Sequence, residues 1–253
     1  MLIQSSFTQL IIANLQARTL AAKSPRLAEA LMSIRAGPSA PANTIANELP
    51  SPAEAIELIR SYMFGHHILC PLLSRSQIIG LYRNIYESCG PDSASCQEHA
   101  SASSQDLFQL NMIFAISAVN LVYRGLHHSP PLGYYVSAMH HFKTIPKMLG
   151  LEAARNLLFL GEFTLLQDTG CSVWDIARIC VRTCLLLDLH QEHPFTDEEV
   201  ANDRRLVFWE SYSLDRLASM TLGRPFSISD RDITAQVGTS WSDKMKRSHA
   251  LVY

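Results

Sequence analysis

Histidines are the first residues to consider for chemistry, because neutral imidazole is the commonest metal-ligating side chain. The chain has ten, and six of them form adjacent pairs: His66 and His67, His127 and His128, and His140 and His141. Adjacent side chains on a helix face different directions, so these pairs predict surface or hydrogen-bonded histidines rather than metal ligands. His190 and His193 lie near Glu192 without the H-E-x-x-H spacing of zinc proteases. The histidines therefore favour no metal site.

Cysteines could supply metal ligands, disulfides or a nucleophile. The six are sparse for this length, which is typical of reduced thiols in an intracellular protein, and they are Cys70, Cys89, Cys96, Cys171, Cys180 and Cys184. No C-x2-C pair occurs, and one isolated C-x6-C pair cannot complete a tetrahedral thiolate site. Cys180 and Cys184 are four apart in an apolar helical pattern, which favours buried, inert thiols over a redox sensor.

Motifs of catalysis are missing from the sequence. There is no G-x-S-x-G elbow and no glycine-rich phosphate loop. Aromatic residues at Trp174, Phe208, Trp209 and Tyr212 either line a ligand cavity between helices or form part of the core, and core is the commoner role. A helical enzyme or small-molecule-binding protein remains an alternative.

Composition limits the classes of partner. The chain has 253 residues, 47% apolar and 17% charged, which is enough to build a packed core. Its formal charge is −2, so it lacks the basic balance expected where phosphate contacts dominate DNA affinity. A short basic run at Lys244, Lys246 and Arg247 is typical of a solvated tail. Direct DNA binding is not expected.

Membrane insertion and secretion are also not expected. No charge precedes Arg18, so the basic region of a secretory signal is missing. The most apolar run, 107–123, contains Gln109, Asn111 and Asn120, and we expect it to fall short of a membrane span and form a buried helix.

Helical periodicity and punctuation predict the positions of the elements. Residues 1–34 form an amphipathic segment with an apolar stripe, 35–51 a proline-rich linker, 52–237 the main domain and 238–253 a polar tail; the stripe residues are Phe7, Leu10, Ile11 and Leu15. Within the domain we expect helices from 52 to Gly65, after Pro71, and over 106–123, 131–148, 151–168, 172–189 and 197–222. Residues 92–105 read as a solvated loop. The fold class is all-α, a multi-helix globular array with short loops.

Two of these helices have faces that can be assigned. In 172–189 the polar stripe is Asp175, Arg178 and Arg182 and most other residues are apolar, which predicts a central helix. In 197–222 the expected core face is Leu206, Trp209, Ser213, Leu217 and Met220. Helix ends are expected at glycines able to adopt the left-handed conformation, namely Gly125, Gly150, Gly170 and Gly223.

The segment RRLVFWESYSLDRLASMTLGRPFSISDRDI, 204–233, resembles the signature of the fungal-specific transcription factor domain, the middle homology region of binuclear zinc-cluster transcription regulators. The signature positions here are Arg204, Arg205, Trp209, Asp215, Arg216, Gly223, Arg224, Pro225, Asp230 and Asp232. Weaker likenesses at 187–190 and 68–72 extend the resemblance over about 52–237. Physically the signature predicts architecture: Gly223 ends a helix, Pro225 prevents its continuation, and Asp215 pairs with Arg216 or Arg224.

The resemblance implies a nuclear regulator of RNA polymerase II transcription, acting through protein or small-molecule contacts and not as an enzyme. Its implied partners are the transcription machinery or a zinc-cluster regulator and a small-molecule effector, with DNA contacted only indirectly and no membrane. The family's six-cysteine cluster is absent from this sequence, so no cofactor is expected unless a zinc cluster lies outside it. The family's domain generally continues in further helices beyond the signature, whereas this sequence stops at Tyr253, so we expect a truncated product or shortened paralogue. A decoy partner of a full-length regulator is a further alternative.

Overall fold

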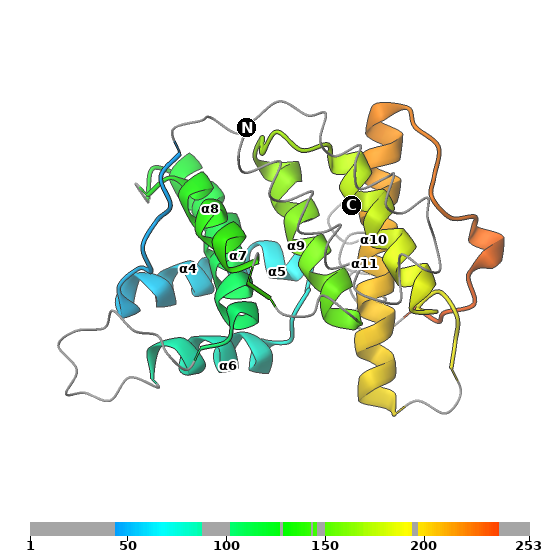
Figure 1. Ribbon diagram of the computed structural model, residues 1–253, viewed down its shortest axis with the longest axis horizontal. Helices are drawn as coiled ribbons and strands as arrows, with labels where there is room; N and C mark the ends of the chain where they lie inside the picture. Colours follow the sequence, from blue (N-terminus) through cyan, green and yellow to red (C-terminus); the bar gives the residue numbers. More distant parts are fainter. Residues whose placement is uncertain are drawn as a thin grey trace, which may run out of the picture. The chain divides into compact units, whose positions relative to one another are not determined.

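The computed structural model describes residues 44–87, 102–126, 129–142, 144–145, 150–193 and 197–237. Within these ranges the regular structure is entirely helical, which confirms the all-α prediction (Figure 1). The N-terminal apolar stripe, most of the serine-rich loop and the polar tail lie outside the described residues, as do Cys89, Cys96 and the basic run at 244–247.

The described helices form two compact units. The first contains α4 (Pro52–Phe64), α5 (His66–Leu69), α6 (Arg75–Tyr86), α7 (Ser104–Tyr123) and α8 (Pro131–Phe142). The second contains α9 (Leu151–Leu166, except its last residue), α10 (Val173–Leu186), α11 (Glu198–Leu222) and the 3₁₀-helix η2 (Asp230–Asp232).

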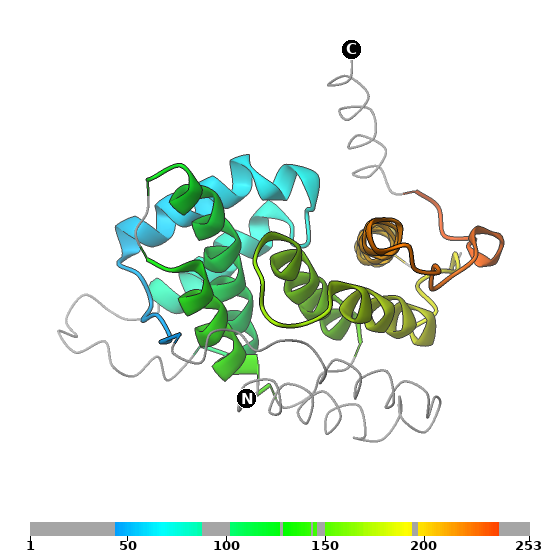
Figure 2. The ribbon, with the colours of Figure 1, turned by 90° about the horizontal axis from the view of Figure 1, so that it is seen from above.

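In the first unit α7 is the central helix, and it packs against α4, α6 and α8 (Figure 2). α7 is long and apolar enough to span a membrane, contrary to the expectation from its polar residues. However, 67% of its most apolar 18 residues are buried inside the protein. Those polar residues are accommodated inside the unit. Asn111 donates to the Leu107 carbonyl of the same helix, and Ser117 donates to the Leu58 carbonyl of α4. The burial agrees with the predicted core helix.

Local capping rules explain where the helices begin. The Ser51 hydroxyl accepts the Glu54 backbone N–H ahead of a proline at the first helical position of α4, as predicted. Ser74 and Gln77 form a reciprocal capping box that starts α6.

Helix ends are explained by backbone conformation. The four glycines named from the sequence all have positive φ, between 62° and 77°. α8 ends at Phe142, earlier than the predicted 148, because Pro146 has no N–H and disfavours helical geometry at Ile145. α9 and α10 also end sooner than predicted. After α10, Asp188 takes the left-handed conformation at φ 52°, and the Leu189 N–H bonds back to the Cys184 carbonyl.

The buried face of α11 differs from the prediction. Leu217 and Met220, expected in the core, are 52% and 72% exposed. The buried face is instead formed mainly by Val207, Phe208, Ser211, Leu214, Asp215, Ala218 and Ser219. The helical period was predicted correctly but the face was not, because Ser211, Asp215 and Ser219 interrupt the apolar residues on the face that is buried.

α9 approaches α11 closely at Gly161. A β-carbon there would lie 2.5 Å from Leu214 Cδ2 and 3.4 Å from Ile176 Cγ2 of α10. Replacing Gly161 with leucine is therefore expected to lower the free energy of unfolding by about 1–3 kcal/mol through overpacking, measured by urea denaturation. Gly80 in α6 is the matched control, because nothing lies within 4 Å of its β-carbon position. Gly80→Ala is expected to stabilise by about 0.5–1 kcal/mol; equal losses in both variants would contradict the close approach.

Candidate functional site

The signature residues lie on α11 and on the segment that follows it in the second unit. Asp215 is completely buried and accepts three hydrogen bonds. Arg216 Nη1 donates to Asp215 Oδ2 at 2.9 Å, the Ser227 N–H to the same oxygen at 3.0 Å, and Ser227 Oγ to Oδ1 at 2.5 Å. The predicted ion pair thus forms with Arg216 and not with Arg224. The two hydrogen bonds from Ser227 attach the exit segment, residues 224–237, to α11.

Arg216 continues this network outward. Its Nη2 donates to the Ile228 carbonyl at 2.8 Å and to Asp230 Oδ1 at 2.7 Å, while the guanidinium lies 4.1 Å from the Tyr212 ring centroid and 4.2 Å from that of Phe226. Tyr212 also donates to Asp230 at 3.0 Å. These hydrogen bonds from Arg216 and Tyr212 hold the pKa of Asp230 below its usual value.

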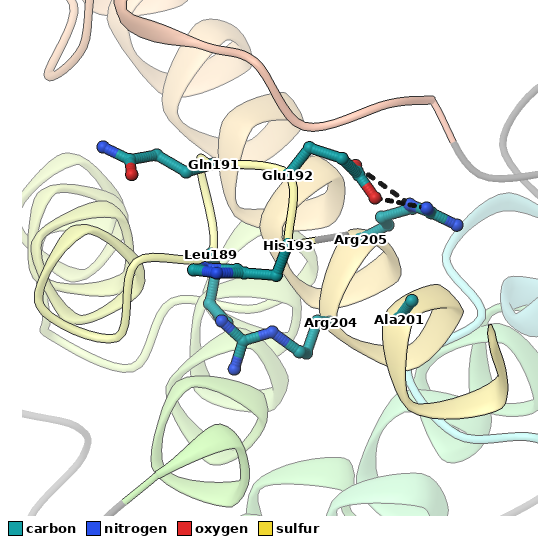
Figure 3. A pocket seen from close by; sticks show the side chains of 7 residues that line it. All are labelled: Leu189, Gln191, Glu192, His193, Ala201, Arg204 and Arg205. Carbon is teal, nitrogen blue, oxygen red and sulfur yellow. Dashed lines mark hydrogen bonds and ion pairs between the residues drawn. The ribbon is translucent and has the colours of Figure 1, made fainter. Parts of the chain in front are cut away.

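A second set of contacts attaches the end of the exit segment to the turn after α10. The Thr234 and Ala235 N–H groups donate to the His190 carbonyl, and the Gln236 N–H donates to Glu192 at 2.9 Å. Arg205 pairs with the same carboxylate (Figure 3). Arg205, followed by the Gln236 N–H, lowers the pKa of Glu192.

The hydrogen bonds of Trp209 and Arg204 give both signature residues a structural role. Trp209 Nε1 donates to the Gln236 carbonyl at 2.9 Å, so the indole holds the same segment from α11. Arg204 Nη2 donates at 3.1 Å to the carbonyl of Leu187, the C-cap residue of α10. The hollow lined by Arg204, Arg205 and Glu192 is about 10 Å³, the size of one water at most (Figure 3). This region is therefore a structural junction.

The remaining signature positions set the path out of α11. Gly223 ends the helix in the left-handed conformation at φ 62°, and Pro225 accepts a hydrogen bond from Ser219 Oγ at 3.3 Å through its carbonyl. Arg224 places its guanidinium 4.7 Å from the Trp174 ring centroid. Asp232 is exposed in η2, and nothing in the described structure explains its place in the signature.

The four aromatic residues divide between the two predicted roles. Phe208, Trp209 and Tyr212 contact one another edge to face or tilted, which is the core-like role. Trp174 instead lines a hollow of about 410 Å³ together with Arg178, Arg182, Leu185, Pro225, Phe226 and Ser227.

Two histidines and two cysteines of the described ranges have structural surroundings. His67 Nε2 bonds to the Leu73 carbonyl, and burial lowers its pKa; His193 Nε2 bonds to the Asp188 carbonyl. Cys180 and Cys184 are fully buried, as predicted. Burial raises the pKa of both thiols, that of Cys184 to about 12, far from the thiolate form that a redox sensor needs.

Two residues that form buried polar contacts were not predicted from the sequence. Ser227 supplies two of the three hydrogen bonds to Asp215, although nothing local distinguishes it from neighbouring serines. Arg155 of α9 is 1% exposed and bonds to Asp203 of α11 at 2.6 and 2.7 Å. A single arginine inside the apolar run LEAARNLLFL was the available signal for it.

Comparison with known proteins gives the family. The family described as the fungal specific transcription factor domain matches residues 59–237. Protein STB5 of Saccharomyces cerevisiae is 27% identical over 187 residues, which cover 70% of this chain and 24% of that protein. The positive regulator of purine utilization of Emericella nidulans is 27% identical over 208 residues, covering 58% of this chain and 20% of that protein.

These matches define the extent of the likeness. An uncharacterized transcriptional regulatory protein of Schizosaccharomyces pombe is 29% identical over 85 residues, 33% of this chain and 10% of its own length. The chain thus spans about a quarter or less of the length of these curated relatives. No solved structure matches it. Because the family match covers well over half of the sequence and includes the whole signature, the chain belongs to the fungal specific transcription factor domain family.

Proposed function

We propose that this chain is the regulatory region of a nuclear regulator of RNA polymerase II transcription, and that it acts by binding proteins or a small molecule. It contacts DNA only through a DNA-binding region on another segment or on a partner. The observation that carries the proposal is the family match over 59–237, whose signature residues build a structural junction. Two of the relatives are named as regulators, one of purine utilization and one of transcription.

The state of the signature carboxylate supports binding rather than catalysis. A general base must be free to accept a proton from a substrate. Asp215 is buried and already accepts hydrogen bonds from Arg216 and from two groups of Ser227. Its arrangement fixes the chain path and leaves no access for a reactant. A formal charge of −2 supports indirect association with DNA.

A tethering experiment tests this function. The full 253-residue chain is fused to a heterologous DNA-binding domain in a fungal host that carries a reporter with the matching sites. We expect reporter transcription to rise or fall several-fold relative to the DNA-binding domain alone. Asp215→Ala is expected to abolish the effect, and Arg83→Ala, at an exposed position in the first unit, to preserve it.

The same protein without the fusion is used to test for direct DNA binding. At physiological salt it is expected to leave duplex DNA unshifted in a gel. A folded, nuclear fusion with reporter output equal to that of the DNA-binding domain alone would contradict the regulatory role. A tight, base-specific complex formed by the chain itself would contradict indirect DNA association.

A further inference from the structure

The hollow beside Trp174 is an open pocket lined by two elements that the signature holds together. One wall is a single stripe of α10, with Trp174, Arg178, Arg182 and Leu185 following at helical spacing. The other wall is the segment leaving α11, at Pro225, Phe226 and Ser227. At about 410 Å³ the hollow lies within the range of small-molecule sites in proteins.

The lining of this hollow carries positive charge. Arg178 and Arg182 are four residues apart on one helix face, a spacing at which like charges repel. Neither forms an ion pair within the described ranges, and no carboxylate belongs to the described lining. Arg224 adds a third guanidinium next to Trp174. An anion between these groups relieves their repulsion, and guanidinium forks match the geometry of carboxylates and phosphates.

Aromatic and apolar groups supply the rest of the wall. The Arg178 guanidinium lies 4.4 Å from the Trp174 ring centroid, a cation–π contact that orients its hydrogen-bond donors. Phe226 is 52% exposed, and it lies with Pro225 and Leu185 in the lining, where a planar apolar group can pack. The combination favours a ligand with an anionic head and a flat body.

The second wall is held in place before any ligand arrives. Ser227 donates twice to the buried Asp215, and the Pro225 carbonyl accepts a bond from Ser219. A preorganised wall lowers the entropic cost of binding. The signature network therefore has a second consequence, because it fixes one side of the arginine-lined hollow.

We propose that this hollow binds a small anion with a planar apolar body, such as an aryl carboxylate or aryl phosphate. The anionic group lies between Arg178 and Arg182, and the flat body packs on Phe226 and Pro225. This inference rests on the proposed function, for which it supplies the effector site.

Phenyl phosphate is the probe for this site, titrated into the full chain by isothermal calorimetry with inorganic phosphate and benzylamine as comparisons. Phenyl phosphate is expected to bind more tightly than inorganic phosphate, and the cation benzylamine not at all. Arg178→Gln and Arg182→Gln are each expected to weaken binding about tenfold or more, because each removes charge-assisted hydrogen bonds. Arg83→Gln removes the same charge from an exposed site in the first unit and is expected to leave affinity unchanged.

Thermal unfolding of each variant tests whether it is folded. Arg182→Gln is the milder change, because the contacts of Arg178 and Arg224 with the Trp174 ring do not involve Arg182. The proposed site would be contradicted if phenyl phosphate did not bind at about 10 mM, or if a variant with both Arg178→Gln and Arg182→Gln bound it with wild-type affinity. If inorganic phosphate bound as tightly as phenyl phosphate, the proposed packing of a planar apolar body would be contradicted. A glutamate-rich peptide that binds through the arginines while phenyl phosphate does not would assign the surface to an acidic protein instead. All these failures leave the reporter result of the tethered chain standing, so the two proposals are separable.

Discussion

Replacing Asp215 with alanine is expected to lower the free energy of unfolding of the second unit by about 3 kcal/mol. The carboxylate is completely buried and compensates the charge of Arg216 while satisfying two donors of Ser227. Breaking a buried pair typically costs about 3–5 kcal/mol. We expect the lower end, because Arg216 keeps its bonds to Asp230 and to the Ile228 carbonyl. Urea denaturation followed by tryptophan fluorescence measures the change.

Two variants make this prediction specific. Asp215→Asn preserves the shape but removes the charge, and it is expected to fall between the wild type and the alanine variant. Arg83→Ala breaks an exposed pair with Glu87, where both side chains are more than 60% exposed, and is expected to cost less than about 0.5 kcal/mol. If Asp215→Ala unfolds with the wild-type midpoint, the junction does not depend on this carboxylate.

Replacing Arg155 with alanine is expected to destabilise the second unit by about 2–4 kcal/mol. Its side chain is 1% exposed and bonds to Asp203 twice and to Glu152. Those two carboxylates are 31% and 47% exposed, so water can solvate them after the substitution. The main loss is therefore the packing of the arginine stem, and the residual cavity sets its size.

A matched variant separates packing from charge. Arg155→Met keeps an unbranched stem of similar length, and it is expected to lose less than about 1.5 kcal/mol. Midpoints of urea denaturation for the three proteins decide between the causes. Equal destabilisation by methionine and alanine would show that the ion pair with Asp203, and not the stem, stabilises the contact between α9 and α11.

Sequence rules located most helix termini because those depend on a few neighbouring residues. Ser51 with Pro52 starts α4, and Gly223 ends α11, as the local patterns predicted. The core face of α11 was predicted wrongly because burial depends on what packs against the helix. Leu217 is exposed while Ser211 is buried, and apolar periodicity cannot report that exchange.

The candidate site shows the same division between local and long-range information. An ion pair of Asp215 with Arg216 or Arg224 was predicted from the signature, and the structure forms it with Arg216. Ser227 lies 12 residues from its partner, and its role depends on the path that Gly223 and Pro225 impose. The hollow beside Trp174 requires α10 and the exit segment to converge, which no sequence spacing reports.

The central claim is that the signature holds the exit segment against α11 and the turn after α10. Amide hydrogen exchange of the full chain tests it most directly. Ser227 and Gln236 donate their N–H groups to Asp215 and Glu192, whereas the Phe226 N–H makes no hydrogen bond within the described structure. We predict slow exchange at Ser227 and Gln236, comparable with the middle of α11, and faster exchange at Phe226. Rapid exchange at all three amides would contradict the clamp.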